Sequence, residues 1–214
     1  MTQTNKLYVL SYFNLRISVG VLGISLPFIL VLGSLILDGE NEILHSISTY
    51  YHTRMRNGLV GIMSAVALFL FAYKGHDLRD NIAGHLGGIF ALGVAFFPNS
   101  LSHPESLIHN LHLASATLFF LVLIYFSIVL FTASDKPKPY SKPKKRRNMV
   151  YFICGFTMLV CIIFIAVVKI WLEKDIPQIE NLKPSFWLET IALVAFGISW
   201  LTKGQAIFKD AKIS

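Results

Sequence analysis

The sequence predicts an all-α membrane protein, a single bundle of six transmembrane helices with cytoplasmic termini. Three observations predict this fold class. The 214 residues are 54% hydrophobic and 14% charged, whereas soluble domains carry about 25% charged residues. The apolar residues fall into six long runs, and the basic residues concentrate in alternate connections between those runs. This composition also excludes a disordered chain, which needs high charge and low hydrophobicity.

Six apolar runs have the composition expected of membrane spans. A helix that crosses a bilayer needs about 20 mainly apolar residues. Two of the runs, at 16 residues each, are shorter and need polar turns at their ends in order to cross. We therefore expect residues 1–214 to form one transmembrane domain, with spans at 15–37, 58–73, 82–97, 107–131, 149–172 and 186–207.

Lysine and arginine are distributed unequally between the two sides of the expected bundle. With a cytoplasmic N-terminus, 14 of the 19 basic residues lie on the cytoplasmic side, 4 lie outside and Lys169 lies within a span. Cytoplasmic connections of membrane proteins carry an excess of Lys and Arg. The asymmetry therefore predicts that both termini are cytoplasmic.

Seven of the basic residues lie in the cytoplasmic segment 134–148, whose prolines and charges predict a loop. One interpretation is attraction to anionic lipids of the cytoplasmic leaflet. The other, which we favour, is a signal that only sets the orientation of the chain. No other feature of the sequence supports nucleic-acid binding, so the expected partners are membrane lipids.

Glycine is frequent in the third run, where Gly84 and Gly88 have small-xxx-small spacing. Small residues at this spacing let two membrane helices approach closely. We therefore expect tight packing between the third run and a neighbouring helix.

Histidines gather on the expected outer side. His109 and His112 open the fourth run at i, i+3 and share one helix face. Ser48 and His52, at i, i+4, share a face if their stretch continues the second helix. Three imidazoles from two elements suit zinc, with water in the fourth position, so His52, His109 and His112 are candidate ligands. The alternative is that these histidines bind only water or lipid headgroups. Five of the seven histidines lie on this side: His45, His52, His103, His109 and His112.

Three polar residues on the same side are candidate catalytic groups. Ser48 could stabilise a developing oxyanion, and Glu189 or Asp38 could accept and return a proton. For Glu189 there is a competing interpretation as a structural ion pair with Lys169. Both residues lie three positions from the outer ends of neighbouring antiparallel runs, and we favour the ion pair.

Arg54, Arg56 and Tyr51 are candidate lipid-binding residues. Arginine pairs well with phosphate, and at headgroup depth these side chains could hold a lipid phosphate. The alternative, which we favour slightly, is that both arginines bind no ligand. Their apolar stems would lie along the membrane-facing surface, and their charged groups would extend to the water at the interface.

Most of the chain resembles a family of bacterial six-span membrane proteins of unknown function. The resemblance lies in three segments, ILHSISTYYHTRMRNGLVGIMSAVALFLFAYKGHD, NIAGHLGGIFALGVAFFP and FWLETIALVAFGISWLTKG. It implies a multi-pass protein of the bacterial inner membrane and implies no activity.

A shorter pattern resembles the CREST superfamily of membrane hydrolases, which includes the alkaline ceramidases and the adiponectin and progestin receptors. Ser48-xxx-His52 and the later pair His109 and His112 carry this resemblance. It implies a zinc ion held by three histidines, with a serine and an aspartate nearby, and hydrolysis of a lipid amide. The sequence departs from the family in its His-xx-His spacing and in having six apolar runs where the family has seven spans.

Two classes of function follow. The first is an integral membrane, zinc-dependent hydrolase that acts on a lipid amide or ester at the outer side of the membrane. The second is a non-enzymatic bundle that binds or transports a lipid or small solute, or an assembly protein. The first class predicts a bound metal, and the second predicts a polar cavity or lipid groove.

Overall fold

The computed structural model describes residues 3–39, 42–75, 77–100, 103, 105–133, 141–172 and 176–208, and their regular structure is helical, with no strand. The expectation of an all-α chain is therefore confirmed for these residues. The long helices among them are α1 (Gln3–Leu37), α2 (Arg56–Phe71), α3 (Leu78–Phe96), α4 (Leu107–Tyr125), α5 (Lys142–Val167) and α7 (Pro184–Lys203). The shorter elements are the 3-10 helices η1 (Ile47–His52) and η4 (Pro177–Leu182), and two π-helical turns, η2 (Phe126–Leu130) and η3 (Val168–Leu172), which continue α4 and α5.

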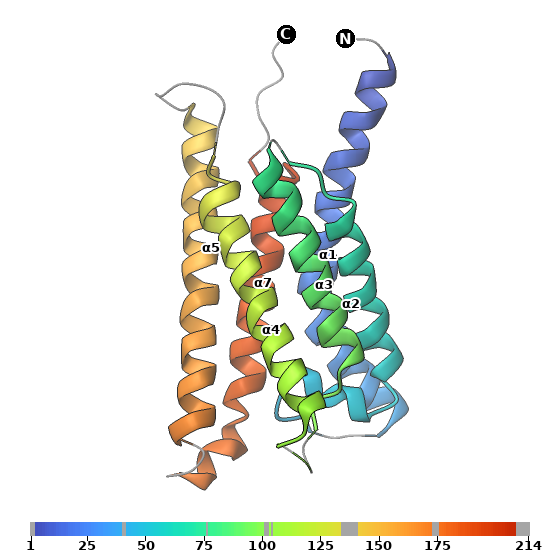
Figure 1. Ribbon diagram of the computed structural model, residues 1–214, viewed down its shortest axis with the longest axis vertical. Helices are drawn as coiled ribbons and strands as arrows, with labels where there is room; N and C mark the ends of the chain where they lie inside the picture. Colours follow the sequence, from blue (N-terminus) through green and yellow to red (C-terminus); the bar gives the residue numbers. More distant parts are fainter. Residues whose placement is uncertain are drawn as a thin grey trace.

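The long helices form a closed ring in chain order, because each packs against the next and α7 packs against both α5 and α1. The start of α1 and the end of α7 lie at one end of the bundle, which we call the terminal end (Figure 1). The opposite end carries η1 and is called the η1 end. Successive helices alternate in direction between the two ends, as the sequence predicts for spans joined by short connections.

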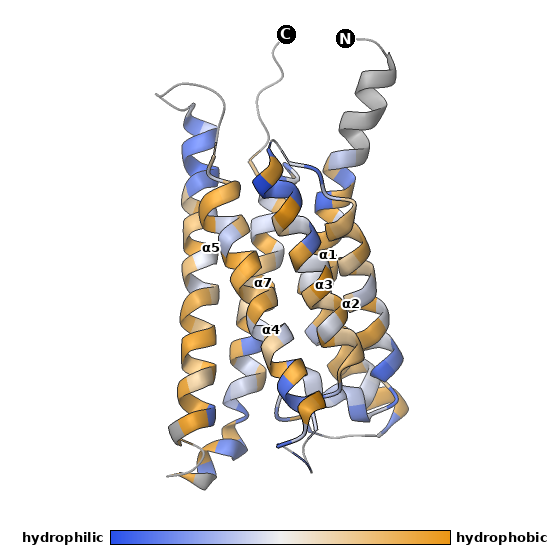
Figure 2. Ribbon diagram, in the orientation of Figure 1, coloured by the Kyte–Doolittle hydropathy of each residue, from blue (hydrophilic) through white to orange (hydrophobic). Residues whose placement is uncertain are grey.

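Four helical segments are long and apolar enough to cross a membrane, namely Tyr12–Leu37, Leu107–Leu130, Lys142–Ile170 and Pro184–Lys203. Helix α2 is apolar but shorter, and the first turn of α3 is polar. Figure 2 shows hydrophilic residues toward the two ends of the bundle, most clearly at the start of α5. These helices indicate a membrane protein. That all six helices cross the membrane, and with which orientation, stays a prediction.

Helix α5 begins within the segment expected to be a loop. Residues 134–140 lie outside the described residues, but the helix starts at Lys142. Ser141 caps it by accepting a hydrogen bond from the amide of Lys144, and Pro143 suits a first helical turn, where no amide donor is needed. The second half of the basic segment is therefore helical, and the prediction of a loop to residue 148 is wrong.

Two pairs of helices approach closely at glycines. A Cβ at Gly84 would lie 2.8 Å from the carbonyl oxygen of Leu70, which confirms the tight packing expected of the glycine-rich run. Between α1 and α7, a Cβ at Gly197 would lie 2.6 Å from the carbonyl oxygen of Gly20. The ring closes at this second contact.

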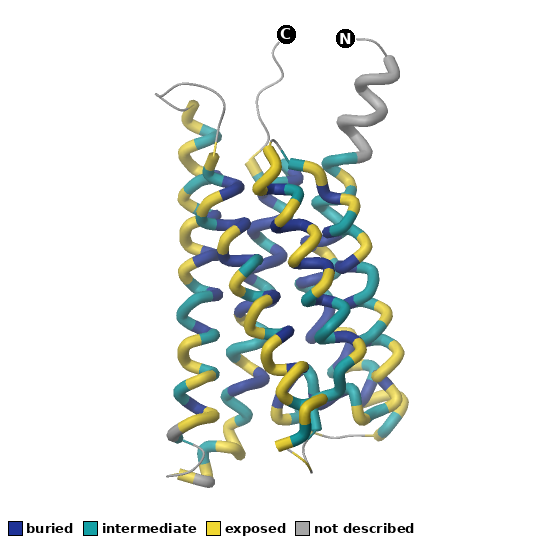
Figure 3. Tube along the Cα trace, viewed as in Figure 1, coloured by how far each residue is buried: buried dark blue, intermediate teal, exposed yellow. Residues whose placement is uncertain are grey.

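An aromatic cluster fills the terminal half of the ring around Trp200, which is fully buried. Its ring centre lies 5.3 Å from that of Tyr73, 5.4 Å from that of Phe126 and 5.3 Å from that of Phe131. Phe126 and Phe131 are five residues apart and would point about 140° apart on an α-helix. The π-helical turn bonds the Phe131 amide to the Phe126 carbonyl and brings both rings to the same tryptophan. Figure 3 shows buried positions concentrated in this half of the bundle.

Candidate functional site

The η1 helix lies across the η1 end and is fixed to the start of α7. Ser46 caps it by accepting a hydrogen bond from the amide of Thr49. The amide of Ile47 donates to Oε2 of Glu189 at 2.6 Å, and the amide of Phe186 donates to the carbonyl of His45 at 3.0 Å. Glu189, a candidate catalytic residue, thus holds η1 against α7 through the main chain.

Lys169 in η3 is exposed and attracts the Glu189 carboxylate electrostatically. This arrangement is compatible with the structural interpretation of the Lys169 and Glu189 pair, which was favoured from the sequence. The Glu189 carboxylate therefore accepts a hydrogen bond from a backbone amide and is attracted electrostatically by Lys169.

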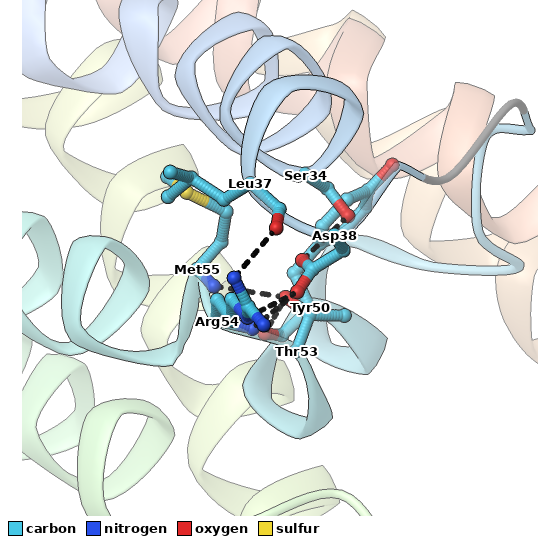
Figure 4. Close-up of polar contacts among 7 residues, drawn as sticks. All are labelled: Ser34, Leu37, Asp38, Tyr50, Thr53, Arg54 and Met55. Atoms are coloured by element: carbon cyan, nitrogen blue, oxygen red, sulfur yellow. Dashed lines mark hydrogen bonds and ion pairs between the residues drawn. The ribbon is translucent and has the colours of Figure 1, made fainter.

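Asp38 joins the end of α1 to the connection before α2. Its carboxylate accepts hydrogen bonds from the Ser34 hydroxyl at 3.1 Å and from the Arg54 amide at 3.3 Å. The Arg54 guanidinium lies 3.6 Å from the same carboxylate and donates to the carbonyl of Leu37 at 2.9 Å. Figure 4 shows Arg54 pointing back toward the end of α1. Asp38 and Arg54, expected in catalysis and in lipid binding, are thus partners of each other.

Tyr51 and Arg56 form a second surface pair. Arg56 donates to the Tyr51 hydroxyl at 2.7 Å, and its guanidinium lies 4.5 Å from the centre of the Tyr51 ring. An arginine over an aromatic face gains a cation–π attraction. Arg56 is exposed, so the guanidinium is held at the surface of the η1 end.

The three candidate zinc ligands surround one connection, residues 97–100 between α3 and α4. A ring nitrogen of His52 bonds to the carbonyl of Asn99, and Nδ1 of His112 bonds to the carbonyl of Phe97 at 2.8 Å. Both nitrogens must donate, because a carbonyl oxygen only accepts. Nδ1 of His109 instead accepts from the amide of Ser100 at 3.3 Å.

The three histidines therefore hydrogen-bond to the same backbone segment, but their ring nitrogens are not gathered around one position. Within the part of the chain that the structure describes, no three His, Cys, Asp or Glu side chains are grouped so that they could hold a metal ion. His109, which accepts through Nδ1, carries its proton on Nε2 in the neutral form. The structure thus brings the three imidazoles to one connection and does not group them around a single point, and a zinc site stays a prediction.

Ser48 and His52 lie in η1, which Thr53–Met55 separates from α2. In a 3-10 helix with three residues per turn, positions i and i+3 share a face and i, i+4 do not. Ser48 and His52 therefore do not lie on one face of a helix, contrary to the expectation for a continued second helix. The Ser48 hydroxyl lies 3.3 Å from that of Ser46, in the cap of η1.

Sequence reasoning missed an open hollow of about 780 Å³ at the η1 end. The residues that line it are Gly39, Glu42, Ile43, Leu44, His45, Asn181 and Lys183. The Lys183 ammonium donates to Glu42 at 2.9 Å, and this hydrogen bond and the charge of Lys183 lower the pKa of Glu42. The two residues are 141 positions apart, so only the packing of α1 against α7 brings them together and no local signal could have paired them.

Comparison with known proteins adds no relative, since no family model, curated protein or solved structure matches the chain. The two resemblances seen in the sequence therefore stay predictions.

Proposed function

We propose that this chain is a six-span protein of the bacterial inner membrane, with cytoplasmic termini, that binds a membrane lipid or small solute without chemically changing it. The hollow lined by Glu42 and Lys183 carries the proposal. Its volume is within the roughly 300–1,000 Å³ of small-molecule sites. It presents one acidic and one basic group side by side, which suits a zwitterionic ligand such as an ethanolamine headgroup.

The burial of the pair supports this assignment. The Lys183 side chain is 18% exposed and the Glu42 side chain is 80% exposed, so the ammonium sits inside the hollow and the carboxylate at its rim. A zwitterion replaces both charges of the pair at once, with its phosphate or carboxylate on Lys183 and its ammonium on Glu42. Glu189 and Asp38, which were considered for catalysis, accept hydrogen bonds from the backbone amides of Ile47 and Arg54, and this structural use of both carboxylates favours binding over chemistry.

Native mass spectrometry of the purified chain with phosphatidylethanolamine tests the proposal. The double variant Glu42→Ala/Lys183→Ala should bind the lipid about tenfold more weakly, since it loses two charge-assisted hydrogen bonds. Glu105→Ala is the matched control. Glu105 belongs to an exposed pair with His103 at the same end and does not line the hollow. Equal binding by the double variant and the wild type would overturn the proposal.

A zinc-dependent hydrolase of lipid amides or esters is the second candidate. One observation favours it. His52 and His112 each donate a ring N–H to a backbone carbonyl, which is how metal-binding imidazoles are commonly oriented. Metal analysis of the purified chain separates the candidates. One zinc per chain, lost in His52→Ala and His112→Ala, would support the hydrolase. Absence of metal, with both variants binding lipid as the wild type does, would exclude it.

A further inference from the structure

The basic run at the start of α5 divides between two faces of the helix. Lys144 and Arg147 lie on the face toward the bundle. Lys144 donates to the carbonyls of Phe131 and Ala133, both at 3.0 Å, and Arg147 donates to the carbonyl of Phe208 at 2.9 Å. Each of the two also has further interactions. Both side chains are therefore part of the packing between α5 and its neighbours at the terminal end.

Three other basic side chains of the run form what we call the outer basic face: Lys142, Lys145 and Arg146. At 3.6 residues per turn they lie within about 100° of one another and about half a turn from Lys144 and Arg147. All three are exposed. Within the part of the chain that the structure describes, no hydrogen bond or ion pair occupies their charged groups. The outer basic face thus carries three unpaired positive charges on the surface of the bundle.

An apolar stripe continues from the outer basic face along the same side of α5, and we call it the outer stripe. Its members are Met149, Phe152, Ile153 and Phe156. Each is more than half exposed. With a rise of 1.5 Å per residue, Phe156 lies about 15 Å from Arg146 along the helix axis, which is half the roughly 30 Å thickness of a hydrocarbon core. A phospholipid whose headgroup lay at the outer basic face would therefore have its acyl chains beside the outer stripe.

The place of these charges at the start of α5 favours an anion over a zwitterion. The first turn of a helix carries a partial positive charge, so cations there raise the electrostatic energy of the chain. No carboxylate of α5 offsets them, because the helix contains neither Asp nor Glu. A phosphate relieves the repulsion between the side chains and also interacts favourably with the helix terminus. A zwitterionic headgroup gains less, because it brings its own ammonium to the same place.

We propose that the outer basic face and the outer stripe together bind an anionic phospholipid, with its phosphate on Lys145 and Arg146. Arginine offers paired donors that match phosphate oxygens, and lysine adds a point charge. Basic segments next to a membrane helix attract anionic lipids. A signal that only sets orientation needs a number of charges and does not need them aligned with an apolar stripe. The proposal is independent of the proposed function, whose hollow lies at the other end of the bundle.

Tryptophan fluorescence of the full-length chain in vesicles of phosphatidylethanolamine and phosphatidylglycerol tests the proposal. Met149→Trp places an indole where the outer basic face meets the outer stripe. Quenching by bromine near the ester groups of one lipid and then of the other gives the ratio of the two lipids at that position. The wild type supplies the signal of the three native tryptophans, which is subtracted.

Leu68→Trp is the matched control for position. Leu68 is 67% exposed and lies near the end of α2 at the same end of the bundle. Helix α2 packs against α1 and α3, across the ring from α5. Each basic residue near an anionic lipid contributes about fivefold, so phosphatidylglycerol should be enriched about tenfold over the bulk ratio at Met149→Trp. At Leu68→Trp the ratio should stay within about twofold of the bulk. Equal ratios at the two positions would overturn the proposal, and this comparison leaves every basic residue in place.

Charge variants in the Met149→Trp chain test the named contacts. Lys145→Gln/Arg146→Gln should lower the enrichment by about fivefold or more, because two of the three outer charges are lost. Lys74→Gln/Arg79→Gln is the control, since both residues are exposed in the region between α2 and the start of α3 and their loss changes the net charge equally. Equal decreases in the two double variants, or no decrease with Lys145→Gln/Arg146→Gln, would mean that net charge alone attracts the lipid and would overturn the proposal.

Discussion

Replacing Gly197 by alanine tests the contact that closes the ring. A Cβ at this position would lie 2.6 Å from the carbonyl oxygen of Gly20, and a backbone atom cannot rotate away as a side chain can. Ordinary contact begins at 3.4 Å, so α1 and α7 must separate by roughly 0.8 Å, with loss of dispersion contacts along both helices.

The expected loss of folding stability in Gly197→Ala is the balance of two opposed effects. Forcing an extra methyl into a packed interior costs about 1–3 kcal/mol, whereas alanine is favoured over glycine within a helix by about 1 kcal/mol. Gly61 of α2 supplies the control, because a Cβ there meets nothing within 4 Å. Comparing Gly197→Ala with Gly61→Ala cancels the helix propensity. Gly197→Ala should be the less stable of the two by about 1–3 kcal/mol.

Reversible unfolding in detergent, followed by circular dichroism against increasing denaturing detergent, measures the difference. Gly20→Ala should also destabilise, since its Cβ would lie 2.8 Å from the carbonyl oxygen of Gly197. The double variant Gly20→Ala/Gly197→Ala should lose less stability than the two single variants together, because one separation of the helices makes room for both methyl groups. If Gly197→Ala were as stable as Gly61→Ala, the close approach of α1 and α7 would be refuted.

Three further outcomes are expected. The hydroxyls of Ser127 and Ser199 lie 2.8 Å apart and are fully buried. Ser127→Ala should therefore cost about 1 kcal/mol by leaving one hydroxyl unpaired, and the double alanine variant should cost less than both singles together in a thermodynamic cycle. Lys183 lowers the pKa of Glu42, so the stabilisation is complete above the ordinary carboxyl range and disappears as pH falls through the lowered pKa. The melting temperature of the wild type should accordingly fall more on acidification than that of Glu42→Gln, and parallel profiles would contradict the pairing. Ser106 caps α4 by accepting from the amide of His109, so Ser106→Ala should lower stability by about 1 kcal/mol and Ser106→Asp should restore it.

Helix positions were the part of the fold most readable from the sequence. The run at 107–131 corresponds to Leu107–Leu130, and the run at 58–73 to Arg56–Phe71, because apolar composition directly reflects burial in lipid or in the bundle. The start of α5 was missed because proline and dense charge look like a loop when the cap at Ser141 is not considered. The π-helical turn at Phe126–Leu130 carries no comparable sequence signal.

The candidate site was predictable only in part. The sequence placed His52, His109 and His112 on one side, and the structure brings them to one connection. Their partners are backbone groups of residues 97–100, which no side-chain pattern can indicate. The bond from the Ile47 amide to Glu189 spans 142 positions. Such contacts depend on which helices close the ring, and spacing along the chain does not contain that information.

The π-helical turn that places Phe126 and Phe131 on one tryptophan also affects how the chain tolerates changes of length. It holds one residue more than an α-helical turn does. Removing one residue from within η2 would restore regular α geometry and turn Phe131 by about 100°, after which the helix ends. The same deletion in the middle of α7 would turn every later residue away from its neighbours. Fewer neighbouring residues are therefore displaced when the end of α4 loses a residue than when the middle of α7 does.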